Sequence, residues 1–238
     1  MNSFRVIKAL LFDFDGVILD TEKPIYQSWL EVYQSFGCQL PLSEWSKVIG
    51  TSPRGFDPFM SLEQQLGRKV DRDSIAPARR KRELELISER PIQPGIHDYL
   101  LCARRLGLKT GVASSSSRRW VEGHLSERGL LNYFDCIRTS DDVGHAKPDP
   151  ELYHAILKCL NILTNQAVAF EDSPNGILAA KQAGLFCVAV PNEITCQLPL
   201  DRADLRLNSL AEMPLDVLIS DIEKRWNGDD NIESVVIL

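Results

Sequence analysis

Two carboxylates, Asp13 and Asp15, follow the first apolar run of the sequence. Residues 9–12 predict a buried strand, and a buried strand end with two unpaired negative charges would be unstable without a cation or hydrogen bonds. Alternate residues of an extended strand point to the same side, so the two carboxylates can share a face until Gly16 turns the chain. The alternative is an ordinary turn, because Asp and Gly commonly end strands. This segment alone leaves both readings open.

A serine cluster follows a second apolar run, at residues 110–113. Ser114, Ser115 and the two serines after them offer hydroxyls and backbone amides between a strand end and a helix start, which suits a phosphate group. The alternative is an ordinary helix N-cap, a role that serine performs well. Taken alone, the cluster favours the cap.

Lys147 precedes two prolines, Pro148 and Pro150, which restrict the local backbone. They place the lysine at the head of a helix that begins near Glu151. Its ammonium group can act there as a point charge against phosphate or a buried carboxylate. The alternative is a solvated loop lysine, which this loop favours when it is considered alone.

A second pair of acids, Glu171 and Asp172, ends the apolar run at residues 167–170. Magnesium prefers oxygen ligands and usually binds one or two carboxylates together with waters and phosphate. The alternative is a helix start, where acidic side chains complement the helix dipole.

These polar clusters follow successive strand-like runs, and a further apolar run covers residues 186–190. Helical patterns separate the last three runs, as in units that build a parallel sheet. The sequence therefore predicts an α/β fold with helices on both faces of the sheet. Because open α/β sheets bind ligands at the carboxyl ends of their strands, the four clusters should converge on one edge and form a site.

Residues 20–91 depart from this alternation of strands and helices, because they are charged, mostly helical in pattern and hold no convincing strand. One reading is a few extra helices within a single domain. The preferred reading is a helical cap, since an insertion that leaves the first strand at its carboxyl end would lie over the site. The predicted division is a discontinuous catalytic core at 1–19 and 92–226, the cap at 20–91 and a C-terminal tail at 227–238.

Composition narrows the class of protein. The chain has 238 residues and a formal net charge of −6, which argues against nonspecific nucleic-acid binding. No stretch approaches the roughly 18 apolar residues of a membrane span, and no signal peptide is recognisable. The six cysteines are scattered without Cys-x-x-Cys spacing. We therefore expect a reduced, cytoplasmic protein, and we expect it to be a monomer.

The ordered set of motifs resembles the haloacid-dehalogenase-like hydrolase superfamily, and more closely its β-phosphoglucomutase-like subgroup. The segment from Asp13 to Val17 matches the first family motif, Ser114 the second, Lys147 the third and Glu171-Asp172 the fourth. The match covers nearly the whole chain to about residue 226. The resemblance implies a Rossmann-like parallel sheet core with the helical cap inserted after the first strand.

The resemblance also implies roles for these positions. Asp13 would attack phosphorus and form an aspartyl-phosphate, and Asp15 would protonate the leaving oxygen and then activate water. Mg²⁺ would be held by Asp13, the carbonyl oxygen of Asp15, Glu171 and Asp172. The phosphate oxygens would be bound by Ser114, Lys147 and the Ser115 amide. These roles agree with the charge neutralisation that phosphoryl transfer requires.

Two further positions bear on the substrate. Arg54 lies in a loop that looks like the family's substrate-recognition loop, although a solvent-facing arginine is an equal alternative; His145 is a weaker candidate for a supporting role beside Lys147. In β-phosphoglucomutases a histidine of the first cap helix assists proton transfer, whereas this sequence has Ile25 there. We therefore expect a phosphatase that acts on a small phosphorylated metabolite of the sugar-phosphate type. A phosphomutase is the main alternative, and a noncatalytic binding protein is a weaker one.

Overall fold

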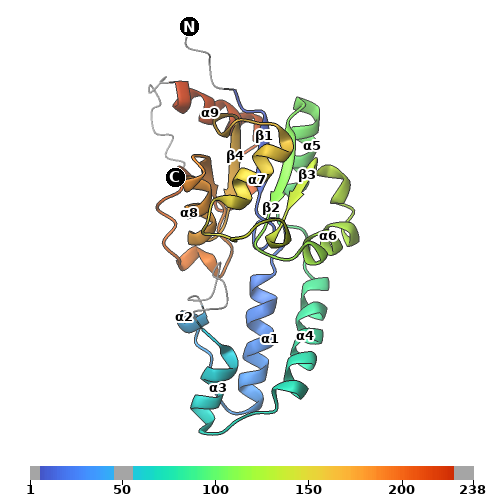
Figure 1. The fold of residues 1–238 in the computed structure, drawn as a ribbon, viewed down its shortest axis with the longest axis vertical. Coiled ribbons are helices and arrows are strands. Elements are labelled where there is room, and N and C mark those ends of the chain that lie inside the picture. The colour runs from blue at the N-terminus through green and yellow to red at the C-terminus, as the bar shows by residue number, and fades with distance from the viewer. Residues whose placement is uncertain (1–5, 46–55, 228–238) are drawn as a thin grey trace.

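A parallel sheet carries the fold (Figure 1), and it has six strands in the part of the chain that the structure describes. The computed structural model describes residues 6–45 and 56–227. The strand order is β3-β2-β1-β4-β5-β6, and every neighbouring pair runs parallel. The strands are β1 (Ala9–Phe12), β2 (Lys109–Ala113), β3 (Cys136–Arg138), β4 (Ala167–Glu171), β5 (Phe186–Ala189) and β6 (Leu205–Arg206).

Five helices cover the two faces of the sheet. They are α5 (Ile96–Leu106), α6 (Arg118–Glu127), α7 (Glu151–Leu160), α8 (Pro174–Gln182) and α9 (Leu215–Asn227). Successive strand residues point to opposite faces, so Leu10 and Phe12 pack with α5, α6 and α9, whereas Ala9 and Leu11 pack with α7 and α8. Short 3₁₀ turns complete this part: η1 (Leu131–Tyr133), η2 (Ser140–Asp142), η3 (Thr164–Gln166), η4 (Thr195–Gln197) and η5 (Leu210–Glu212).

The predicted α/β fold is confirmed, and the four predicted strand runs correspond to β1, β2, β4 and β5. These central strands are buried on both faces and therefore read as continuous apolar runs. The edge strands β3 and β6 were not predicted. They are three and two residues long and are only partly buried, so neither leaves an apolar run in the sequence.

Among the described residues, four helices lie between β1 and α5 and form an insertion: α1 (Glu22–Ser35), α2 (Leu42–Trp45), α3 (Pro58–Leu66) and α4 (Arg72–Ser88). They extend from one end of the sheet, with α1 and α4 side by side (Figure 1). Trp29, Tyr33 and Leu62 belong to a separate apolar cluster, which Ile194 of the sheet-bearing part also joins. The two connecting segments run next to each other, because Leu19 bridges to Ile92. The domain boundaries at 19/20, 91/92 and 226/227 stay predictions.

The expectation that all six cysteines are reduced is wrong for one pair. Cys136 of β3 and Cys159 of α7 form a disulfide, with their Cα atoms 6.5 Å apart. They are 23 residues apart in sequence and meet only because α7 packs beside β3, so their spacing carries no signal. Cys38, Cys102, Cys187 and Cys196 are free.

Within the described ranges, none of the helices combines the length and the apolar character that crossing a bilayer requires.

Candidate active site

Asp13 is the first residue after β1, and the sheet itself sets its backbone. Its amide donates to the carbonyl of Phe170 in β4 at 2.9 Å, which continues the β1–β4 ladder by one residue. Its side chain is buried, and its Oδ1 accepts the Phe14 amide at 2.8 Å. The carboxylate therefore occupies a defined position at the carboxyl end of the central strands.

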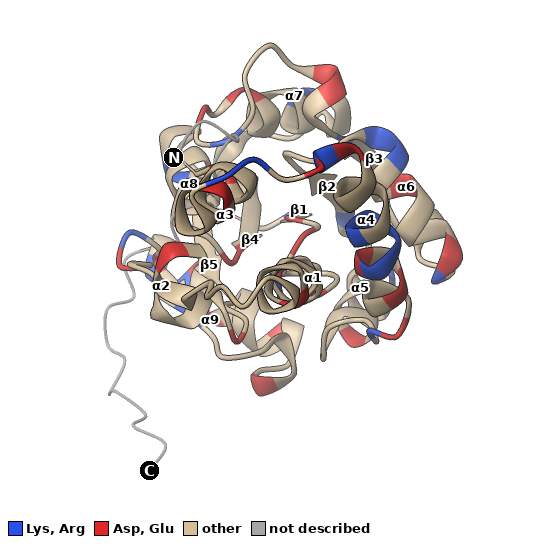
Figure 2. Ribbon diagram, turned by 90° about the horizontal axis from the view of Figure 1, so that it is seen from below, with Lys and Arg blue, Asp and Glu red and all other residues tan. Residues whose placement is uncertain are grey.

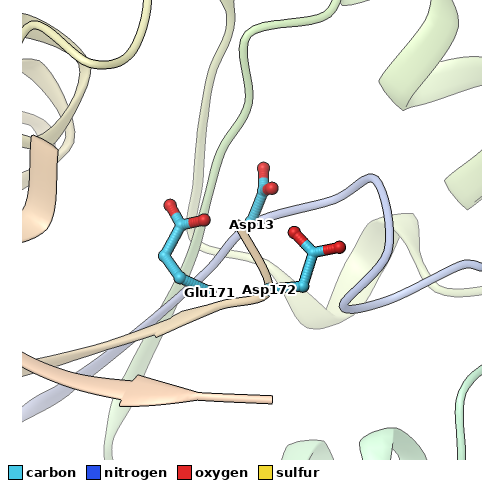
Figure 3. A group of neighbouring side chains, drawn as sticks. All are labelled: Asp13, Glu171 and Asp172. Carbon is cyan, nitrogen blue, oxygen red and sulfur yellow. The ribbon is translucent and has the colours of Figure 1, made fainter. Parts of the chain in front are cut away.

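Glu171 and Asp172 reach the same position from β4. Because β1 and β4 are parallel neighbours with Phe12 opposite Phe170, their carboxyl ends lie side by side. Asp13, Glu171 and Asp172 each offer an oxygen within 4.8 Å of the others, and all three are buried (Figure 3). The first and fourth sequence clusters thus form one group of carboxylates.

Lys147 provides the positive charge for this group. Its Nζ lies 2.8 Å from Asp13 Oδ1 and 2.7 Å from Glu171 Oε1, and the side chain is buried. Burial alone would lower the pKa of Lys147, but Asp13 and Glu171 more than offset it, so its pKa lies above the ordinary value. Lys147 is therefore a charged link between the two strand ends rather than a solvated loop residue.

Tyr153 of α7 fixes the other carboxylate in this link. Its hydroxyl donates to Glu171 Oε1, and burial together with the charge of Glu171 raises its pKa well above the ordinary value, so it stays a neutral donor. Oε2 of Glu171 is buried and has no hydrogen-bond partner among the described residues. A buried carboxylate oxygen of this kind is a free ligand position.

Two glycines let the backbone approach these carboxylates closely. A Cβ on Gly176 would lie 1.8 Å from Glu171 Oε2, and a Cβ on Gly16 would lie 2.0 Å from Asp172 Oδ2. Gly16 also has a φ of +86°, which disfavours other residues. The carboxylates therefore fill spaces that only glycine leaves open.

The carboxylates carry more negative charge than Lys147 can balance. Burial raises the pKa of Asp13 to about 7, with Lys147 lowering it and Glu171 and Asp15 raising it. Burial, followed by the charges of Asp13 and Glu22, raises the pKa of Asp172 well above its ordinary value. Oxygen ligands, excess negative charge and an unpartnered buried oxygen together fit a hard divalent cation.

Asp15 is held by four hydrogen bonds. Its Oδ1 accepts from Thr21 Oγ1 at 2.8 Å and from Trp120 Nε1 at 2.9 Å. Its Oδ2 accepts from Ser116 Oγ at 2.6 Å and from Ser114 Oγ at 3.3 Å. The donors come from the start of the insertion, from the loop after β2 and from α6, so this carboxylate has a defined orientation.

A cavity of about 400 Å³ opens beside these groups. Figure 2, which views the molecule from the side of the insertion, shows the ends of β1 and β4 between α1, α3 and α4. The lining residues come from both the insertion and the strand ends: Asp13, Asp15, Glu22, Ile25, Arg80, Glu83, Ser115, Ser116, Ser117, Trp120, Lys147, Asp172 and Ser173.

The other residues predicted from the sequence differ in whether they reach the cavity. Ser115 is exposed and lines the cavity, whereas Ser114 is fully buried and binds Asp15 and the Ser116 amide. His145 is exposed, with its ring 3.4 Å from Glu151 at the surface. Arg54 lies outside the described residues.

Sequence reasoning missed several residues that the fold brings to the site. Tyr153 belongs to the apolar face of a helix, and Trp120 lies within the first turn of α6, so neither position carries a local signal. Asn192, in the loop after β5, donates to Asp172 Oδ2 at 2.7 Å. Glu22 is half-buried beside the cavity, and burial and the neighbouring Asp15 raise its pKa to about 8. Only the sheet order and the helix orientations bring these residues together.

Comparison with known proteins gives the family. The model of the family described as "Haloacid dehalogenase-like hydrolase" matches residues 10–190, a range that contains all four clusters. The chain belongs to this family. The resemblance read from the motifs is therefore confirmed.

Two similar proteins have names of phosphatases. The chain is 46% identical over 220 residues to the "Putative phosphatase YhcW" of Bacillus subtilis, covering 92% of this chain and all of the relative. It is 30% identical to the "Phosphorylated carbohydrates phosphatase" of Thermotoga maritima, covering 75% and 82%. β-Phosphoglucomutase from Clostridium difficile shares the fold, with a TM-score of 0.71 at 24% identity over 94% and 100% of the two chains. The protein is a phosphoric monoester hydrolase of the haloacid-dehalogenase-like type.

Replacing Lys147 by Met removes the cation between Asp13 and Glu171 and keeps an unbranched side chain. We expect the free energy of unfolding of the metal-free protein at pH 8 to fall by about 3–5 kcal/mol, the usual cost of leaving a buried charge unpaired. Urea denaturation measures this loss.

The loss of unfolding free energy caused by Lys147→Met should be smaller at pH 5 than at pH 8. The pKa of Asp13 is already raised to about 7, and removing Lys147, which lowers it, raises it further. A carboxyl group with a raised folded-state pKa destabilises the fold as pH rises through that pKa, and it costs little where it is protonated. Lys158→Met, at an exposed position of α7, is the control and should change stability by less than about 0.5 kcal/mol. A loss for Lys147→Met that is equal at pH 5 and pH 8 would contradict this electrostatic account.

Proposed function

We propose that this enzyme hydrolyses a small phosphorylated metabolite of the sugar-phosphate type, with Mg²⁺, through an aspartyl-phosphate on Asp13. The observation that carries the proposal is the buried group of Asp13, Glu171 and Asp172 with Lys147 between two of them, beside a cavity. Phosphoryl transfer depends on positioning and on neutralising the charge of the phosphoryl oxygens, and this group is suited to both.

Asp13 is the nucleophile in the proposed mechanism. Its carboxylate forms a bond to phosphorus while the bond from phosphorus to the leaving oxygen breaks, and water later attacks the same phosphorus and releases Asp13. Asp13, Glu171, Asp172 and the Asp15 carbonyl would hold Mg²⁺, which supplies positive charge against the phosphoryl oxygens. Lys147 adds a fixed positive charge at Asp13 Oδ1.

Asp15 moves the protons in this mechanism. It gives a proton to the leaving oxygen in the first step and takes one from the attacking water in the second. The four donors around its carboxylate support this role, because a group that exchanges protons with two different oxygens must keep a fixed position. The proposed phosphate-binding groups are Lys147, Ser114 and the Ser115 amide; Ser115 lines the cavity, and Ser114 is buried behind it.

Water is the proposed acceptor of the phosphoryl group. Ile25 lines the cavity from α1 and has no group that can exchange protons, and no histidine occurs in residues 20–91. A phosphomutase must transfer the phosphoryl group to a sugar hydroxyl, and the position that resembles the proton-transferring histidine of β-phosphoglucomutases is Ile25 here. The relative named for phosphorylated carbohydrates supports a sugar phosphate as the substrate.

A panel of phosphorylated metabolites with Mg²⁺ tests the reaction. We expect release of inorganic phosphate, with the highest kcat/KM for a sugar or polyol phosphate. Asp13→Asn should lower kcat by at least about a thousandfold, because the amide cannot act as the nucleophile. Asp201→Asn, at an exposed position, is the control and should keep normal turnover. Full turnover by Asp13→Asn, or positional isomerisation without phosphate release, would overturn the proposal.

Mg²⁺ should stabilise the fold in a pH-dependent way. A ligand at about 100 times its Kd adds about 2.7 kcal/mol to the free energy of unfolding. The pKa of Asp13 is raised to about 7 and that of Asp172 is also raised, so protons compete with the cation below pH 7. At a fixed Mg²⁺ concentration, the rise in Tm should therefore be larger at pH 8 than at pH 5.5.

Asp172→Asn separates this effect from general salt stabilisation. It removes one proposed ligand charge, so most of the Mg²⁺-dependent rise in Tm at pH 8 should disappear. The metal-free wild-type protein should itself lose stability as pH rises from about 4 to 8, since carboxyl groups with raised folded-state pKa values favour the fold only while they are protonated. An Mg²⁺ effect that is equal at both pH values would contradict the proposed ligands.

A further inference from the structure

Trp120 contacts the site through a single polar atom. Its indole Nε1 lies 2.9 Å from Asp15 Oδ1, and the same oxygen accepts from Thr21 Oγ1. Trp120 belongs to the first turn of α6, where the Ser117 carbonyl accepts its backbone amide at 3.1 Å. The indole is therefore attached to a rigid element of the sheet-bearing part and directed at the group proposed to transfer protons.

The indole differs chemically from the other three partners of Asp15. Thr21, Ser114 and Ser116 are hydroxyls, which can rotate and either donate or accept, whereas an indole N–H only donates. Oδ1 must therefore stay an acceptor toward Trp120. Both partners of Oδ2 are hydroxyls, so Oδ2 is the oxygen that can carry the acid proton without losing a hydrogen bond.

The helical insertion also contacts this indole. The guanidinium carbon of Arg80 in α4 lies 4.5 Å from the centre of the Trp120 ring, and both residues line the cavity. Arg80 is anchored by Glu83, a buried residue that Arg79 contacts as well. His124, also in α6, makes a T-shaped contact with the indole, with the two ring centroids 4.3 Å apart. The position of Trp120 thus depends on both the core and the insertion.

We propose that Trp120 is a positioning residue for Asp15, and that Arg80 connects this positioning to the placement of the helical insertion. The indole N–H holds Oδ1 and thereby orients Oδ2 for proton transfer to the leaving oxygen. The inference rests on the role proposed for Asp15 and adds a residue from outside the four motif clusters. It also accounts for an aromatic residue at the junction of the two parts of the molecule.

The key variant is Trp120→Phe, which removes the N–H and keeps an aromatic ring for Arg80 and His124. The readout is kcat/KM for two substrates with different leaving groups. This parameter covers only the steps up to departure of the leaving group, so the later hydrolysis of the aspartyl-phosphate does not affect it. An alkyl phosphate needs a proton on its leaving oxygen, whereas p-nitrophenyl phosphate releases a stable phenolate without one.

We expect Trp120→Phe to lower kcat/KM about tenfold or more for the best sugar phosphate of the panel, and less than about threefold for p-nitrophenyl phosphate. Asp15→Asn should show the same selectivity with a larger loss. Equal losses on both substrates, or no loss on either, would overturn the role of Trp120.

A second variant covers the case in which Trp120→Phe fails to fold. Trp120→Leu also removes the donor and should show the same selective loss, with folding of each variant checked by circular dichroism. If Asp15→Asn discriminates between the substrates and neither Trp120 variant does, the inference fails and the proposed function stands. Full turnover by Asp13→Asn would instead remove the proposed function itself.

Arg80→Ala tests the connection to the insertion. Its loss on the sugar phosphate should be non-additive with that of Trp120→Phe, because both changes act on the orientation of Asp15. Arg79→Ala is the matched control, since Arg79 also contacts Glu83 but stacks on Trp29 instead of Trp120. It should leave the ratio of the two kcat/KM values unchanged. Additive losses for Arg80 and Trp120 would refute the connection.

Discussion

The ion pairs of Lys147 with Asp13 and Glu171 neutralise buried charge that would otherwise separate the two central strand ends. Three buried carboxylates lie within 4.8 Å of one another, and such a group is unfavourable unless cations and hydrogen bonds compensate it. Lys147 supplies one charge and Tyr153 one hydroxyl, while Glu171 Oε2 keeps no partner among the described residues. The remaining negative charge is the property that suits the site to a divalent cation.

The parallel sheet determines which groups can take part. Because β1 and β4 are adjacent and in register, residues more than 150 positions apart become neighbours at the same edge. Lys147 enters from the loop before α7, and the serine cluster enters from the end of β2. Asp13, Lys147, Glu171 and Asp172 come from loops or strand ends, while β1 and β4 beneath them are fully buried and hold the backbone in place.

The helical insertion gives the cavity a second wall. Ile25 and Glu22 of α1 and Arg80 of α4 face the cavity, and they meet groups of the core around Asp15. The groups proposed for phosphoryl transfer thus belong mainly to the sheet edge, whereas the proposed leaving group would meet the insertion. The two walls of the cavity come from different segments of the chain.

The sequence by itself determined the central strands and the residues at their ends. Both signals are local: a strand buried on two faces is a continuous apolar run, and Asp13 or Glu171 directly after such a run is conspicuous. It did not determine the edge strands β3 and β6, the disulfide between Cys136 and Cys159, or the contact of Trp120 with Asp15. The edge strands are too short and too exposed to leave an apolar run. The disulfide and the Trp120 contact depend on how helices pack across the sheet, which spacing along the chain does not encode. Tertiary structure therefore decided how the acids at the strand ends are oriented and compensated, because most of their partners come from distant elements.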